Sequence, residues 1–189
     1  AETPKPGDPI FEPVQNMILG NLSRALDAYA LEEKNRGFNP VRLTATLQGE
    51  ASQAAKFLCS VAKEVRQSGN PLPAPACLLS GGETTVTLKG KGKGGRNMEL
   101  ALAAGIELAG QDGMMLLSAG SDGTDGPTDA TGAFASGTTV ERARALGLDA
   151  QNFLDENDSY HFFLPLKNLL VTGPTRTNVM DIQILLVDE

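Results

Sequence analysis

The spacing of hydrophobic residues predicts a chain in which helices and strands alternate. Apolar side chains recur every three or four positions, as in amphipathic helices, in residues 21–36, 50–67 and 97–108. Nearly continuous apolar runs, as expected for strands buried on both faces, occupy residues 76–82, 114–120 and 182–187. Residues 41–47 alternate and are rich in β-branched types, which favours another strand. We therefore expect an α/β domain with helices packed on a mostly buried, mixed sheet.

Shorter segments complete this prediction. Short apolar or alternating runs that we interpret as strands lie at residues 14–19, 84–89 and 168–173. The second of them is close enough to residues 76–82 to form a hairpin with that strand. A short helix is predicted over residues 138–147, and residues 157–159 are interpreted as a helix cap. Between these elements, residues 121–133 form a long polar loop.

Composition and charge narrow the class of protein. Hydrophobic residues make up 41% and charged residues 21% of the 189 positions, which is typical of a globular chain. The net charge of -7 argues against nucleic acid or an anionic membrane as the general partner. No apolar run is long enough to span a bilayer, and no secretory signal is visible. We interpret Cys59 and Cys77 as reduced core residues, which favours a cytoplasmic protein.

The first thirteen residues contain four prolines and predict a stiff, extended connector. Two interpretations of this connector remain open. It is either a trimmed N-terminus or a segment that joined another domain.

The densest positive charge lies on the most flexible backbone, in the sequence GKGKGGRNMEL at residues 90–100. Glycines let a ligand approach the main chain closely, and a helix start carries unpaired N–H groups. Lys91, Lys93 and Arg96 add full charges there, and Arg96 has no evident structural partner in the sequence. The loop therefore predicts a binding site for a phosphate or carboxylate. The alternative is a solvated turn with incidental lysines.

Two known phosphate motifs are less consistent with this loop. Gly90, Gly92 and Gly95 fit the dinucleotide pattern G-x-G-x-x-G, but the acidic residue expected about 20 positions later is poorly placed at Asp112 or Asp122. A Walker A loop is excluded because no Lys-Ser or Lys-Thr follows the last glycine.

Two further polar loops carry candidate ligands. Asp122, Asp125 and Asp129 supply hard oxygen atoms after a buried strand, which suggests Mg²⁺ or substrate hydroxyls as readily as an ordinary surface turn. A loop over residues 171–181 offers donors to phosphate or sugar oxygens, or forms a capped turn; these donors are Thr172, Thr175, Thr177 and Asn178. The single histidine, His161, lies between aromatic residues and is interpreted as packed, which argues against a histidine-dependent triad.

Six motifs in order resemble the C-terminal half of class II glycerate kinases (glycerate 2-kinases), including the MOFRL domain. They are ETPKPGDPIF, LLSGGETTVT, GKGGRN followed by EL, SAGSDGTDGPTDATGA, NDSYHFF and TGPTRTNVMD. The resemblance covers nearly the whole chain. It implies an enzyme that uses ATP and Mg²⁺ to phosphorylate the 2-hydroxyl of D-glycerate, giving 2-phosphoglycerate.

The same resemblance assigns expected roles and domains. It implies a catalytic or phosphate-contacting role for Arg96, and phosphate or nucleotide binding by Lys91, Lys93, Gly94, Gly95, Asn97, Thr172, Thr175 and Asn178. Substrate or metal binding is expected of Glu83, Asp122 and Asp125, the last two as the candidate metal ligands. Residues 1–13 become an interdomain connector, residues 14–189 the C-terminal α/β region of a two-domain kinase, and residues about 76–187 a MOFRL-type domain.

The chain also departs from the family pattern. Met98 replaces a usual glutamine, and Arg176 replaces a usual glycine. The Rossmann-like N-terminal domain of the family is absent, so the chain alone is expected to be inactive or nearly so. A non-catalytic module that binds a nucleotide or sugar acid is one alternative, and a dinucleotide-dependent reductase is another.

Overall fold

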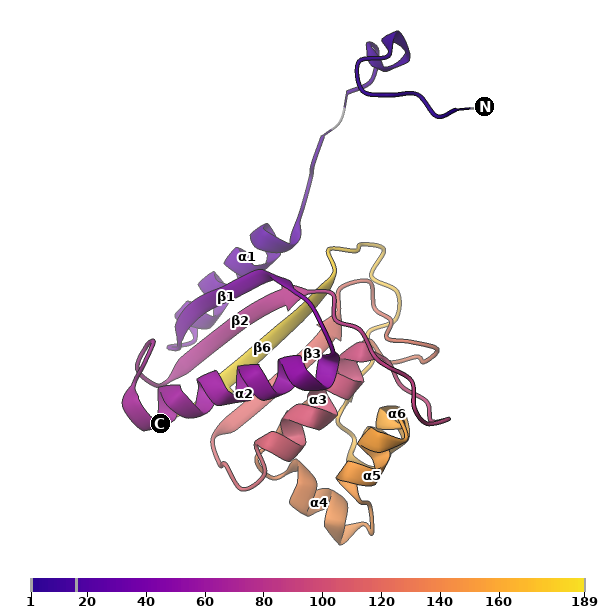
Figure 1. The fold of residues 1–189 in the computed structure, drawn as a ribbon. Coiled ribbons are helices and arrows are strands. Elements are labelled where there is room, and N and C mark those ends of the chain that lie inside the picture. The colour runs from indigo at the N-terminus through magenta and orange to yellow at the C-terminus, as the bar shows by residue number, and fades with distance from the viewer. Residues whose placement is uncertain (1, 16, 189) are drawn as a thin grey trace.

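A mixed sheet of six strands forms the centre of the molecule in the computed structural model, which describes residues 2–15 and 17–188 (Figure 1). The strands are β1 (Asn39–Leu47), β2 (Ala76–Gly82), β3 (Met114–Gly120), β4 (Gly132–Ser136), β5 (Leu169–Leu170) and β6 (Asp181–Val187). Their spatial order is β1-β2-β6-β3-β4-β5. Only the β1–β2 pair of this sheet is parallel. The predicted α/β fold with a mixed sheet is confirmed.

Helices lie on both faces of the sheet. They are α1 (Leu22–Asn35), α2 (Ala51–Ser68), α3 (Arg96–Glu107), α4 (Thr139–Ala145), α5 (Ala150–Asp155) and α6 (Ser159–Leu166). Strand β2 shows the two faces clearly, because neighbouring side chains on a strand point in opposite directions. Leu78 packs into the cluster beneath α2 and α3, whereas Cys77 and Leu79 pack with Leu22 and Leu26 of α1.

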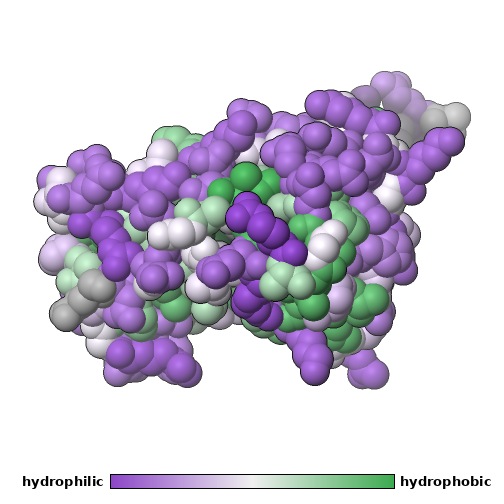
Figure 2. Space-filling view, turned by 90° about the horizontal axis from the view of Figure 1, so that it is seen from below, coloured by the Kyte–Doolittle hydropathy of each residue, from purple (hydrophilic) through white to green (hydrophobic). Residues whose placement is uncertain are grey.

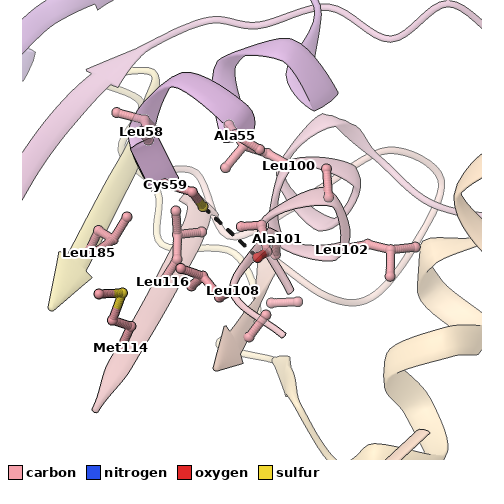
Figure 3. Packing of buried hydrophobic residues seen from close by; sticks show 14 of the residues in the cluster. Ala55, Leu58, Cys59, Leu100, Ala101, Leu102, Leu108, Met114, Leu116 and Leu185 are labelled. Carbon is pink, nitrogen blue, oxygen red and sulfur yellow. Dashed lines mark hydrogen bonds between the residues drawn. The ribbon is translucent and has the colours of Figure 1, made fainter. Parts of the chain in front are cut away.

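The larger core is formed by small and aliphatic side chains between α2, α3 and the sheet. Figure 3 shows Cys59 of α2 facing Ala101 of α3, with Leu116 of β3 beside them. The Sγ of Cys59 lies 3.9 Å from the carbonyl oxygen of Ala104, and both cysteines are free and buried. Alanines on both helices allow α2 and α3 to approach closely, and both helices pack on the same face of the sheet.

The long helices begin and end where their sequence signals indicate. The side chain of Asn21 accepts a hydrogen bond from the backbone N–H of Arg24 at the start of α1. Gly69 ends α2 in the left-handed conformation that glycine favours. The predicted strands at residues 41–47, 76–82, 114–120 and 182–187 are also confirmed.

The predicted hairpin between residues 76–82 and 84–89 is wrong. Residues 84–89 are irregular, and Thr85 makes only an isolated parallel bridge to Glu50. The reason is that β2 already has β1 on one side and β6 on the other, so it offers no free edge to a following strand. The segment instead leaves the sheet, with Val86 resting against the core.

The predicted strand at residues 14–19 is also wrong for the residues that the structure describes. Val14, Met17, Ile18 and Leu19 are exposed and irregular, and Asn16 lies outside the described residues. Figure 1 shows this segment projecting from the start of α1, away from the sheet. It has the hydrophobicity of a strand but no neighbouring strand to pair with.

Some elements have little sequence signal. No strand was predicted at Gly132–Ser136, which is short and contains small residues. Its first two residues fall at the end of the predicted polar loop, yet the segment forms β4 and pairs with β3 along its length. The predicted strand at residues 168–173 is shorter in the structure and covers only Leu169–Leu170.

No helix in the described part of the chain is both long and apolar enough to cross a membrane. One face of the molecule, shown in Figure 2, mixes small hydrophobic patches with hydrophilic side chains.

Candidate functional site

Loops from three parts of the chain meet along the edge of the sheet formed by the carboxyl ends of β2 and β3. Strand β6 pairs antiparallel with both β2 and β3, so the two ends Gly82 and Gly120 both lie opposite Asp181. The loops that follow β2 and β3 and the loop that precedes β6 therefore meet at this edge (Figure 1). In α/β sheets, ligands commonly bind beyond the carboxyl ends of strands, where such loops gather.

Arg96 lies at the centre of this edge and has a strong structural partner. Its Nε and Nη2 donate to the two carboxylate oxygens of Asp181 at 2.5 and 2.9 Å. The side chain of Asp181 is only 1% exposed, whereas that of Arg96 is 35% exposed, and Glu83 lies 3.6 Å from Nη2. The expectation that Arg96 has no structural partner is wrong. The hydrogen bond that Arg96 donates to Asp181 raises the pKa of Arg96 further, so this guanidinium stays charged.

The start of helix α3 already holds a carboxylate of the protein. Asp125 accepts hydrogen bonds from the backbone N–H groups of Asn97 at 3.1 Å and Met98 at 2.8 Å. Its burial raises the pKa of its carboxyl to about 6, although these N–H donors pull in the other direction. The helix-start position that the sequence assigned to a ligand anion is therefore occupied by Asp125, as is common for helix N-termini.

The glycines of the loop allow it to lie directly on the segment before α6. A β-carbon on Gly90 would lie 2.3 Å from the backbone of Glu156, and one on Gly92 would lie 2.3 Å from the side chain of Asp158. The carboxylate of Asp158 also accepts a hydrogen bond from the backbone N–H of Lys93 at 2.8 Å. Close packing within the protein thus accounts for these glycines, without any ligand.

Gly94 gives a direct test of that packing. Gly94→Ala is expected to lower the free energy of unfolding by about 1–3 kcal/mol, because the added methyl carbon would lie 2.3 Å from Oγ of Ser159. This Oγ is buried and has no hydrogen-bond partner among the described residues, so Ser159→Ala alone is expected to be neutral or slightly stabilising. Urea denaturation of both single variants and the double variant measures the coupling. An equal cost of Gly94→Ala in both backgrounds would contradict the contact.

Lys93 of the loop lies against an aromatic ring that is itself hydrogen-bonded to an acidic residue. The Nζ of Lys93 lies 4.4 Å from the ring centre of Tyr160, whose hydroxyl donates to Asp129 at 2.8 Å. Lys91 is exposed. One of the two lysines, Lys93, is therefore held near the loop by an aromatic ring.

The prediction that His161 is packed is wrong, because its side chain is 54% exposed and lies 2.6 Å from the carboxylate of Asp158.

Small-molecule pockets commonly have volumes of about 300–1,000 Å³, and one of 550 Å³ lies beside Arg96. Segment 83–88 forms one wall, and the loop with α3 forms the other. Its lining includes four of the predicted site residues, which are Glu83, Gly94, Gly95 and Arg96, together with two that were not predicted, Glu99 and Asn157. Asn97 does not line it: its side chain is buried and accepts a hydrogen bond from Ser118 at 2.6 Å.

The C-terminal loop lies on the loop that follows β3, away from the pocket beside Arg96. Thr175 donates through its backbone N–H to the carbonyl of Asp122 at 3.0 Å and through its hydroxyl to that of Ser121 at 2.6 Å. Thr172 and Thr175 line a separate 170 Å³ hollow. Asn178 is exposed and uses its side-chain oxygen to bind the backbone N–H of Met180. The structure therefore does not bring these three residues together with Arg96.

Arg176 has φ of 61°, in the left-handed region that favours glycine. A glycine, the usual residue in the resembled pattern, would adopt this backbone more easily. The arginine side chain is exposed at the tip of the same loop.

The acidic residues do not form a preformed metal centre. The described residues contain no group of three His, Cys, Asp or Glu side chains able to hold a metal ion. Asp122 uses Oδ1 to accept hydrogen bonds from the N–H and hydroxyl of Thr124. A β-carbon on Gly120 would meet this Oδ1 at 3.1 Å and Oδ1 of Asp181 at 3.6 Å, so both carboxylates lie at the same sheet edge.

Asp181, Glu99 and Asn157 were missed as site residues for different reasons. Asp181 closes the motif TGPTRTNVMD, but only the pairing of β6 between β2 and β3 brings it to Arg96. Glu99 follows Arg96 by three positions, which places it on the same side of α3, and that signal was present in the sequence. Asn157 was interpreted only as a helix cap.

Comparison with known proteins adds a family match. A family model described as the MOFRL family matches residues 76–181. A D-glycerate 2-kinase from Thermotoga maritima is 45% identical over 186 residues, which cover 98% of this chain and 44% of that protein. A putative hydroxypyruvate reductase from Agrobacterium vitis is 41% identical over 172 residues, which cover 90% of this chain and 45% of that protein.

Solved structures show the same fold. The crystal structure of glycerate kinase from Thermotoga maritima superimposes with a TM-score of 0.90 at 46% identity and covers 92% of this chain and 42% of that one. A crystal structure of a protein from Pyrococcus horikoshii gives a TM-score of 0.88 at 40% identity, with 94% of this chain and 41% of that one covered. The chain spans less than half the length of these relatives.

Proposed function

The chain belongs to the MOFRL family, and we propose that it supplies the C-terminal part of an ATP-dependent glycerate 2-kinase. In this reaction the γ-phosphoryl group of ATP is transferred to the 2-hydroxyl of D-glycerate, giving 2-phosphoglycerate and ADP. The proposal is supported by the glycerate kinase names of relatives that match almost the whole chain. The structural observation that carries it is the fixed guanidinium of Arg96 on the wall of a 550 Å³ pocket.

Arg96 is suited to stabilising phosphoryl oxygens. Asp181 holds its Nε and Nη2, while Nη1 donates to no residue that the structure describes. A guanidinium whose orientation is fixed in advance loses little freedom when it binds a phosphate. Phosphoryl transfer depends mainly on positioning and on neutralising charge that develops on the transferred group. We assign this catalytic role to Arg96, with Lys91 and Lys93 adding longer-range positive charge. Gly94 and Gly95 line the same pocket and hold the loop against Ser159 and Asp125.

The remaining predicted ligands are assigned by position. Kinases of this type use Mg²⁺, which commonly takes one or two protein carboxylates together with substrate phosphates. Asp122 fits that requirement, because its Oδ2 accepts no hydrogen bond from the described residues. Glu83 lies on the pocket wall and would orient the glycerate hydroxyls. The oxygens of Asp125 are engaged by α3, so we assign this residue to supporting the Arg96 loop.

We further propose that a second domain completes the site. Residues 1–13 would connect it to this α/β region, and the pocket beside Arg96 has one side open to solvent. A domain on that side would supply the other wall and exclude water during transfer. The isolated chain is then expected to bind ligands weakly and to turn over slowly or not at all.

A coupled assay for ADP release from D-glycerate and ATP tests this proposal. The chain is assayed alone and then fused behind the N-terminal part of the Thermotoga maritima relative. We expect turnover from the fusion and at most a trace from the isolated chain. Ready turnover by the isolated chain would contradict the two-domain proposal. A fusion that is folded by circular dichroism and binds ATP in calorimetry but never transfers phosphate would favour a non-catalytic binding module.

A dinucleotide-dependent reductase is a second candidate, because the Agrobacterium vitis relative is named a putative hydroxypyruvate reductase. The local geometry is less consistent with it. The strand that should precede G-x-G-x-x-G is absent at residues 84–89, and the helix start that would bind pyrophosphate holds Asp125. Titration with NADH, followed by its fluorescence, separates the two activities.

A further inference from the structure

Glu99 is a buried carboxylate on the wall of the pocket that also contains Arg96. The residue is only 5% exposed, yet it lines the 550 Å³ pocket and a second pocket between α2, α3 and α5. It lies three positions after Arg96 in α3, so the two side chains project from neighbouring turns of one helix face. Acids buried in this way are rare unless they are paired or used.

One oxygen of Glu99 is held and the other is available. Oε2 accepts a hydrogen bond from the side-chain amide of Asn157 at 2.9 Å. Oε1 accepts none from the described residues and is not among the buried atoms that lack a partner. The carboxylate is thus oriented by one oxygen, while the other is not fully enclosed by the protein.

Asn157 is itself fixed, which makes the orientation of Glu99 rigid. Its side-chain oxygen accepts hydrogen bonds from the backbone N–H groups of Lys89 at 2.7 Å and Gly90 at 3.0 Å. Its backbone has φ of 52°, an uncommon conformation for a residue other than glycine. Uncommon backbone conformations that the surroundings maintain are concentrated at functional sites.

The charges around Glu99 favour its protonated form. Burial raises the pKa of its carboxyl, and the nearby carboxylates of Glu50, at the start of α2, and Asp125, after β3, raise it further. The amide of Asn157 and the ammonium of Lys89 act in the opposite direction. A carboxylate with a raised pKa is a stronger base than an exposed one.

We infer that Glu99 is the general base of the reaction and takes the proton of the substrate hydroxyl through Oε1. This inference rests on the proposed kinase function. The O–H bond of the 2-hydroxyl breaks as its proton moves to Oε1, and the hydroxyl oxygen forms a bond to the γ-phosphorus. The bond from the γ-phosphorus to the β,γ-bridging oxygen breaks, and ADP leaves with that electron pair. Arg96 neutralises the phosphoryl oxygens during this transfer.

Glu99→Gln in the fusion enzyme tests the inference, because glutamine keeps the shape and can still accept from Asn157. We expect kcat to fall by about 10²–10³-fold, with the KM for ATP within about threefold of wild type. The unmutated enzyme should lose kcat/KM as the pH falls through the raised pKa of Glu99, and the variant should lose that dependence. Glu107→Gln, at the other end of the same helix, is the matched control and should behave as wild type.

The outcomes separate this inference from the function on which it rests. An unmutated fusion without turnover overturns both. An active fusion whose Glu99→Gln variant keeps its kcat and its acid-side pH dependence overturns only the role of Glu99. If Glu99→Gln does not fold, Glu99→Asp replaces it. That variant withdraws the carboxylate by one methylene, and kcat is expected to fall about tenfold with KM unchanged; an unchanged kcat would overturn the inference.

Discussion

Arg96→Ala in the fusion enzyme is expected to lower kcat by about 10²–10³-fold, the usual loss when one group that stabilises transition-state charge is removed. The expected cause is that Arg96 lines the pocket and its Nη1 donates to no described residue, while Asp181 holds the other two nitrogens. A coupled assay at saturating ATP and glycerate measures kcat, and calorimetry with ATP measures affinity. Arg96→Lys is the informative comparison, because it keeps the charge but cannot bind Asp181 through two parallel hydrogen bonds.

Lysine is expected to recover only part of the loss, since its ammonium has no fixed orientation at this position. Two results would contradict the role of Arg96. One is an alanine variant with wild-type affinity and turnover. The other is a lysine variant with full activity, which would show that charge alone is sufficient and that the geometry set by Asp181 has no effect.

The isolated chain with Arg96→Ala is also expected to lose about 3–4 kcal/mol of stability at pH 7. The reason is asymmetric burial: Asp181 is almost completely buried and would keep a negative charge without its partner, whereas Arg96 is partly exposed. Asp181→Asn should cost less, because the arginine can turn toward solvent. The double variant, in which no buried charge remains unpaired, should recover much of the loss. Urea denaturation of the four proteins measures the cycle.

A double variant as unstable as Arg96→Ala would show that the cost has another origin than the unpaired carboxylate.

The sequence predicts the helices and buried strands well because their signals are local. The apolar faces of α2 and α3, the cap at Asn21 and the continuous runs in β2, β3 and β6 do not depend on distant residues. Strand β4 and the irregular segment 84–89 were misjudged because their conformation is decided by which sheet edges are free. Pairing is a property of the whole sheet, and a single strand pattern does not contain it.

The candidate site could be predicted only in part, for the same reason. The sequence indicated Arg96 and the pocket residues Glu83, Gly94 and Gly95. It could not show that Asp125 fills the start of α3, or that Asp181 fixes the guanidinium, because both contacts join residues that are 28 and 85 positions apart. The glycines were interpreted through ligand binding, but their closest neighbours are the chain itself.

The position of β6 between β2 and β3 also limits the order in which the molecule can be assembled during translation. Both flanking strands leave the ribosome at least 60 residues before the strand that joins them, since β3 ends at Gly120 and β6 begins at Asp181. Until then the nascent chain has two half-sheets with unsatisfied edges, which are open to pairing with other chains. Arg96 also lacks the Asp181 carboxylate until that residue is synthesised. A product truncated before Asp181 would therefore lack both a continuous sheet and an oriented guanidinium.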